Sequence, residues 1–231
     1  MLERISYSDG PLALTGWLAR PAGTPRAAIV LFPTIVNANP AMERRAAMLA
    51  EAGFLTLIAD FYGEPVESFA AAGPLAQKLR ETSDGYRARL RAAIAALREL
   101  ADGLPMGAVG YCMGGQAALE AARDGADLAV AVSFHGLLDT QAPALPGSVV
   151  PRILVCHGDA DPMVPRSQVL AFCEEMDAAG AEWHFHAYSG VRHGFSDPAS
   201  DARGLDAVKY NASADRQSWA AMIALFDEVF G

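Results

Sequence analysis

Short apolar runs alternate with alanine-rich segments along the whole chain, and this alternation constrains the fold more than any other feature of the sequence. Repeated units of a buried strand followed by a helix form a mostly parallel sheet with helices on both faces. The sequence therefore predicts an α/β fold. Strands are expected at 27–32, 54–59, 106–111, 128–134, 153–157 and 182–188.

The first twenty residues differ from this pattern, because two strand-like runs at 4–7 and 12–19 flank the dipeptide Asp9-Gly10. Asp-Gly between two such runs is typical of a tight β-hairpin, so an antiparallel hairpin is expected to precede the parallel sheet. The segment 60–73 contains Gly63 and Pro65 and is expected to be irregular. Helices are expected at 41–52, 74–81, 84–101, 113–123, 165–179 and 213–229.

Length and composition favour one globular domain over residues 1–231, since 52% of the residues are hydrophobic and 19% are charged. The net charge of −9 argues against nucleic-acid binding. No apolar stretch is long enough to cross a bilayer and no secretory signal precedes the hairpin, so a cytoplasmic protein is expected. The three cysteines fit neither a disulfide framework nor a zinc site, and no metal or cofactor is predicted. Nothing in the sequence sets the oligomeric state.

The run Gly110-Tyr111-Cys112-Met113-Gly114 lies between a predicted strand and a predicted helix. It has the form of a nucleophile elbow, with cysteine in the position of the usual serine. A helix N-terminus favours the thiolate, which is the reactive form of cysteine. The alternative is a buried structural cysteine in a glycine-rich turn. Cys156 and Cys173 fit the role of small core residues.

Two further loops that follow predicted strands carry an acid and a histidine. Asp161 is expected to hold a histidine tautomer, and Asp159 is its rival in the same loop. His193 lies between glycines after the last strand and is the candidate general base. Nucleophile, acid and histidine thus follow one another in the order of an α/β-hydrolase triad. The sequence therefore predicts Cys112, Asp161 and His193 as catalytic residues.

A triad of this kind needs donors for the oxygen of a tetrahedral intermediate. The backbone N–H groups of Met113 and Ile35 are expected to form this oxyanion hole. The substrate pocket is expected to hold a small, partly apolar acyl group. Its lining is predicted to include Thr34, Tyr111, His135 and Phe195.

The cysteine elbow, the loop that ends in Asp161 and the run His193-Gly194-Phe195 resemble the dienelactone hydrolase family, as does Asp60-Phe61-Tyr62-Gly63. The resemblance covers nearly the whole chain. It implies a compact α/β-hydrolase fold with little or no cap domain. It also implies hydrolysis of a small-molecule ester or lactone through a cysteinyl acyl-enzyme.

The chain departs from the family's pattern at two positions. Thr34 stands where dienelactone hydrolases carry a glutamate that helps to activate the cysteine, and threonine cannot take up a proton at neutral pH. The family's arginine shortly after the histidine is missing, and Asp197 would repel a substrate carboxylate if it faced the pocket. Arg80 is another possible clamp for a carboxylate. A substrate different from that of the muconate-pathway enzymes is therefore expected.

These departures keep two alternatives open. The chain could be a non-hydrolytic binding protein or a thiol redox regulator on the same scaffold, since a fold does not guarantee an activity. It could also be an acyl transferase that uses the same triad, which differs from a hydrolase only in the second acceptor.

Overall fold

A computed structural model describes residues 2–66 and 68–231, and Met1 and Glu67 lie outside the described residues. The sheet has eight strands in the order β1-β2-β4-β3-β5-β6-β7-β8. β2 is antiparallel to β1 and β4, and the other neighbours are parallel, which confirms the α/β class and the initial hairpin. The strands are β1 (Glu3–Asp9), β2 (Leu12–Ala19), β3 (Ala27–Phe32), β4 (Phe54–Ile58), β5 (Met106–Tyr111), β6 (Val130–Phe134), β7 (Arg152–Gly158) and β8 (Trp183–Tyr188).

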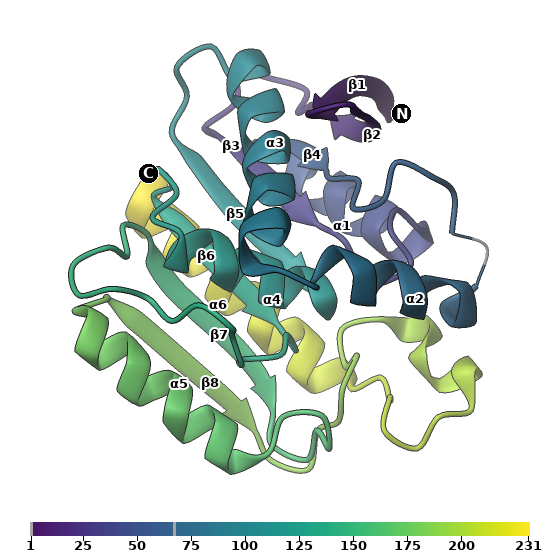
Figure 1. Cartoon of the computed structure of the whole chain (residues 1–231), viewed down its shortest axis with the longest axis vertical. Coiled ribbons are helices and arrows are strands. Elements are labelled where there is room, and N and C mark those ends of the chain that lie inside the picture. The colour runs from purple at the N-terminus through teal and green to yellow at the C-terminus, as the bar shows by residue number, and fades with distance from the viewer. Residues whose placement is uncertain (1, 67) are drawn as a thin grey trace.

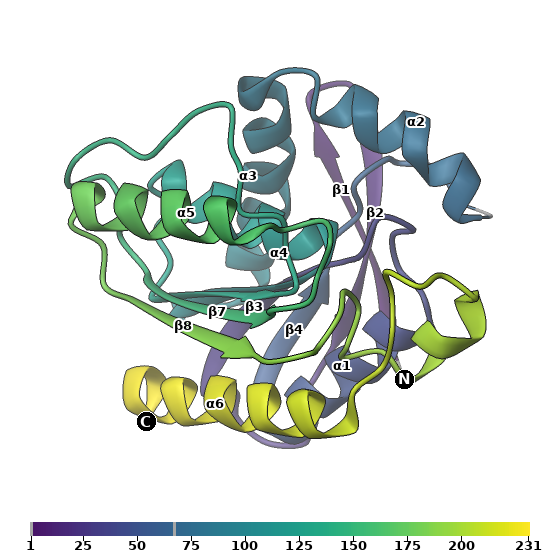
Figure 2. The same ribbon diagram turned by 90° about the horizontal axis from the view of Figure 1, so that it is seen from below.

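Helices cover both faces of this sheet (Figure 2). α1 and α6 lie on one face, and α3, α4 and α5 lie on the other. Among the described residues, no helix has the length and apolar character that crossing a bilayer requires. The helices are α1 (Pro40–Glu51), α2 (Phe69–Leu79), α3 (Ser83–Leu100), α4 (Met113–Arg123), α5 (Arg166–Ala179) and α6 (Ala212–Phe230), with a 3-10 helix, η1 (Pro198–Arg203).

The central strands are buried along their whole length. Every residue of β3, β4, β5 and β6 is buried, because helices cover both of their faces. The edge strand β8 instead alternates between half-buried and exposed residues. The apolar runs that stood out in the sequence are therefore the middle of the sheet.

The segment before α3 differs from the expectation. α2 begins at Phe69, five residues before the predicted start at Pro74. The Ser68 side chain caps it by accepting from the N–H of Ala71 at 3.2 Å, and Ala72 is fully buried. A proline inside a helix removes one hydrogen bond, which is why the sequence favoured Pro74 as a helix start. Capping and packing offset that cost here.

The site loops all begin where parallel strands end. β5, β6 and β7 are neighbours, with Tyr111 opposite Phe134 and Phe134 opposite Cys156. The residues that follow these strands therefore leave the sheet side by side (Figure 1). Such an edge is where α/β sheets bind ligands.

Candidate active site

Cys112 occupies a strained turn between β5 and α4. Its φ of 57° and ψ of −119° are unusual for a residue with a side chain, and strain of this kind persists only where the surroundings enforce it. The glycines on either side make the turn possible. A Cβ on Gly110 would overlap the Gly114 carbonyl, and one on Gly114 would overlap the Phe32 carbonyl. This is the geometry expected of the elbow.

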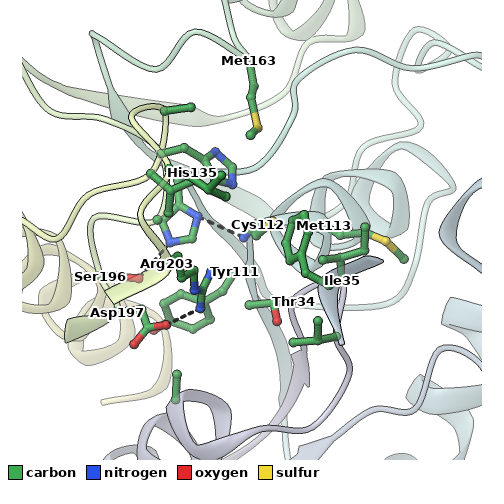
Figure 3. A pocket seen from close by; sticks show the side chains of 18 of the residues that line it. Thr34, Ile35, Tyr111, Cys112, Met113, His135, Met163, Ser196, Asp197 and Arg203 are labelled. Carbon is green, nitrogen blue, oxygen red and sulfur yellow. Dashed lines mark hydrogen bonds and ion pairs between the residues drawn. The ribbon is translucent and has the colours of Figure 1, made fainter. Parts of the chain in front are cut away.

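His135, the residue after β6, supports the elbow from the side. Its Nδ1 accepts the backbone N–H of Cys112 at 3.1 Å, and its Nε2 lies 2.8 Å from Oγ of Ser196 (Figure 3). Because Nδ1 accepts, Nε2 carries the proton and donates it to Ser196. Burial, with the nearby His193 and Arg45, lowers the pKa of His135 well below its usual value, so the ring is neutral.

His193 is held by the acid that the sequence favoured. Its Nδ1 lies 2.7 Å from Oδ2 of Asp161, and both side chains are buried. The other carboxylate oxygen accepts the N–H of Met163 at 2.9 Å. The rival Asp159 is turned away and binds the guanidinium of Arg166 at 2.7 and 3.0 Å. The structure therefore brings Cys112, His193 and Asp161 together and leaves Asp159 outside.

The thiol and the imidazole shift each other's pKa. Burial alone would raise the pKa of Cys112, but His193 and the backbone N–H groups of Met113 and Ile35 outweigh burial, and the net shift is downward. Burial would lower the pKa of His193, but the Cys112 thiolate and the Asp161 carboxylate raise it overall. The two shifts therefore favour a thiolate beside an imidazolium over the neutral thiol and imidazole.

The two predicted oxyanion donors come from different elements. Met113 begins α4, and Ile35 lies in the loop after β3. The carbonyl of Ile35 accepts the Tyr62 hydroxyl at 2.9 Å, which fixes the peptide next to the donor. Both N–H groups lower the pKa of the Cys112 thiol, as donors that favour a negative charge beside it do.

A partly buried hydrogen-bond network holds the loop that carries Ile35. Asn37 has a φ of 63°, and its side-chain amide donates to Asp60 at 2.7 Å while its oxygen accepts the N–H of Phe61 at 2.9 Å. The Asp60 carboxylate also accepts the backbone N–H groups of Thr15, Tyr62 and Gly63 at 2.9 to 3.0 Å. Sequence reasoning did not assign Asp60 this role, and only its place in the family-like run pointed to it.

A cavity of about 460 Å³ opens in front of the thiol, and three of the four predicted pocket residues line it: Thr34, Tyr111 and His135. Oγ1 of Thr34 accepts the side-chain amide of Asn39 at 3.0 Å. The prediction for Phe195 is wrong. Its ring is fully buried, does not line the cavity, and packs against His135 with ring centroids 5.2 Å apart.

In the part of the chain that the structure describes, the charged side chains on the cavity wall form ion pairs within the protein, with the exception of Arg80. Asp197, which was expected to repel a carboxylate, forms an ion pair with Arg203 at 2.6 Å (Figure 3). Arg45 is buried in an ion pair with Asp215. Arg80 differs, because it binds the Gln116 side chain and the Ala76 carbonyl at 3.2 Å, and no carboxylate of the described residues lies within ion-pair distance.

Comparison with known proteins gives a consistent result. Residues 14–230 match the family model described as the dienelactone hydrolase family. The chain is 32% identical over 220 residues to a probable 2-oxo-3-(5-oxofuran-2-ylidene)propanoate lactonase from Bradyrhizobium sp., covering 88% of this chain and 84% of the relative.

Solved structures share the whole fold. A dienelactone hydrolase-like promiscuous phosphotriesterase, P91, from metagenomic libraries is 32% identical and superposes with a TM-score of 0.93, covering 100% of this chain and 99% of that one. A putative dienelactone hydrolase from Klebsiella pneumoniae superposes at 0.81 with 20% identity, covering 98% of each chain, and supports the fold alone.

Proposed function

Since the chain belongs to the dienelactone hydrolase family and is an ester or lactone hydrolase, we propose that it works through Cys112, His193 and Asp161, with a cysteinyl thioester intermediate. The observation that carries this proposal is the buried hydrogen bond by which Asp161 holds His193, on the same cavity as Cys112 and its strained turn. The substrate is a small ester or lactone, as the cavity of about 460 Å³ indicates.

In the first half of the reaction, the Cys112 thiolate attacks the carbonyl carbon of the substrate. The N–H groups of Met113 and Ile35 hold the oxygen that becomes negative in the tetrahedral intermediate. As the intermediate collapses, the carbon–oxygen bond to the alcohol breaks, and His193 gives its proton to the leaving oxygen. An acyl thioester on Cys112 and a neutral imidazole result. For a lactone, the alcohol stays attached to the acyl group.

In the second half, the neutral His193 takes a proton from water, and the hydroxide attacks the thioester carbon. The carbon–sulfur bond breaks and returns the thiolate beside the imidazolium, and the acid product leaves. Asp161 keeps the Nδ1 proton in place, so that Nε2 faces the reacting groups in both halves.

This mechanism needs no glutamate at position 34. The groups that lower the pKa of the thiol are His193 and two backbone N–H groups, and Thr34 is not among them. The hydroxyl of Thr34 instead accepts from Asn39 at the start of α1. The thiolate of the resting enzyme is therefore maintained by the imidazolium and the oxyanion donors.

The location of the acyl group tests this proposal. The protein would be mixed with 4-nitrophenyl acetate, quenched in acid within milliseconds to seconds, digested and analysed by mass spectrometry. We expect an acetyl group on the peptide that contains Cys112, together with a burst of 4-nitrophenol. Acetylation of another residue during productive turnover, with Cys112 unmodified at every time, would contradict the proposal. A panel with a butyrolactone and a carboxylated dienelactone then separates ester from lactone hydrolysis.

A further inference from the structure

The mouth of the cavity is bordered by exposed apolar side chains from three separate segments. Phe69 at the start of α2 is 49% exposed, Met163 between β7 and α5 is 41% exposed, and Leu205 after η1 is 47% exposed. Figure 3 shows Met163 over the cavity, and Figure 1 shows α2 and the η1 segment on the same side of the molecule. We call these three residues the apolar collar.

The collar is not a random scatter of surface residues. Single exposed apolar side chains are normal in proteins, but here three of them border one opening that leads to a reactive thiol. The apolar lining also continues inward from the collar toward Cys112. It includes Ile35, Met42, Met113, Leu137 and Val208.

The charges on the same wall do not favour an anionic ligand near the collar. Asp197 neutralises Arg203, and Asp206, next to Leu205, pairs with Arg192. The one arginine without an acid partner among the described residues of this wall is Arg80, at the end of α2. The three collar residues therefore provide apolar contact area, and the only unpaired guanidinium among the described residues of this wall is that of Arg80.

We propose that the apolar collar binds the hydrocarbon tail of a neutral ester and makes the enzyme select esters with longer tails over those with the shortest. This inference rests on the proposed function and names the substrate class of the same site. Covering an exposed methylene completely raises kcat/KM about fourfold, and covering half of it raises kcat/KM about twofold, because the tail leaves water only in the bound state. Selectivity should therefore increase with the length of the tail.

Two ester series test the collar without assuming which half of the substrate lies on it. One series is 4-nitrophenyl esters with two to eight acyl carbons, and the other is alkyl acetates from methyl to hexyl, followed by pH-stat. The variants are Phe69→Ser, Met163→Ser and Leu205→Ser. Leu170→Ser is the matched control, because Leu170 is 59% exposed on α5 and does not line the cavity. All four positions are exposed, so the substitutions should leave the fold intact.

We expect kcat/KM of the wild type to rise at least about tenfold from the shortest to the six-carbon member in one or both series. In the series that rises, each collar variant should reduce kcat/KM of the six-carbon member about threefold or more and leave that of the shortest member within about twofold. The Leu170 variant should match the wild type throughout. A flat profile in both series, or collar variants indistinguishable from the Leu170 variant, would overturn the proposal. Failure of the proposed function gives a different result, since acetate hydrolysis would then be absent or independent of Cys112.

Discussion

Oδ2 of Asp161 lies 2.7 Å from Nδ1 of His193, while Asp159, two residues earlier, binds Arg166 at the surface. The difference provides a matched pair of substitutions. Asp161→Asn should lower kcat at least about a hundredfold, because an amide can donate to Nδ1 and so favours the wrong tautomer. Asp159→Asn should change kcat less than about twofold. Steady-state hydrolysis of one aryl ester measures both, and equal effects of the two substitutions would argue against the role of Asp161.

The mutual pKa shifts of Cys112 and His193 predict an unusual pH profile for alkylation. The pKa of the thiol is lowered, so iodoacetamide should react with Cys112 at pH values where an ordinary thiol is protonated. The thiolate is lost only as pH falls through this lowered pKa. In His193→Ala the cation is gone while burial remains, so the midpoint should move upward, toward or above the ordinary value.

The measurement for this prediction is the rate of iodoacetamide reaction between pH 4 and 10, with mass spectrometry used to confirm that Cys112 is the site. His186→Ala is a suitable control, because His186 lies on β8 and is not among the groups that shift the thiol pKa. If the midpoints of the wild type and His193→Ala coincide, His193 does not stabilise the thiolate.

The network at Asn37 predicts an effect on catalysis at a distance. Asn37 donates to Asp60 at 2.7 Å and has a positive φ of 63°. Asn37→Gly keeps this backbone conformation accessible but removes the hydrogen bonds that position the loop of Ile35. We expect kcat to fall about tenfold to a hundredfold and KM to change less than about threefold, because the oxyanion donor acts mainly in the transition state.

Thermal unfolding of Asn37→Gly should accompany the kinetic measurement, since the loss of these partly buried hydrogen bonds costs stability as well. The kinetic assay is run well below the unfolding midpoint. A variant that loses stability but keeps the wild-type kcat would show that the network supports the fold alone.

Arg80 predicts a dependence on substrate charge. Its guanidinium lines the cavity and has no carboxylate partner among the described residues. Arg80→Gln should lower kcat/KM for a carboxylated dienelactone about tenfold and leave that for 4-nitrophenyl butyrate within about twofold. Lys78→Gln, at an exposed position of α2, removes the same charge without facing the cavity. If Arg80→Gln and Lys78→Gln have equal effects, the arginine does not bind the carboxylate.

Much of the fold could be predicted because the sequence pattern and the burial have the same cause. Central parallel strands are covered on both faces, so they are continuous apolar runs, as in β3 and β5. The order of Cys112, Asp161 and His193, each following a predicted strand, then predicted that they meet at one edge of the sheet. That inference needs only the topology, because the carboxyl ends of parallel strands share an edge.

The remaining features depend on tertiary packing. The start of α2 is set by the Ser68 cap and by buried Ala72, which outweigh Pro74. Phe195 follows a glycine in a loop, and only the packing of its ring against His135 shows that it belongs to the core. The hydrogen bond from Cys112 to His135 likewise depends on two residues with positive φ. Local propensity does not predict such pairs.

The most direct test of the account is the turnover of a neutral aryl ester by the wild type and by Cys112→Ala. The substitution removes only a sulfur atom from a half-buried side chain, so circular dichroism and thermal unfolding should show a folded protein. We predict that the wild type hydrolyses the ester and that kcat/KM of Cys112→Ala falls by at least about a thousandfold. Hydrolysis by the folded variant at a rate near that of the wild type would contradict the central claim that Cys112 is the nucleophile.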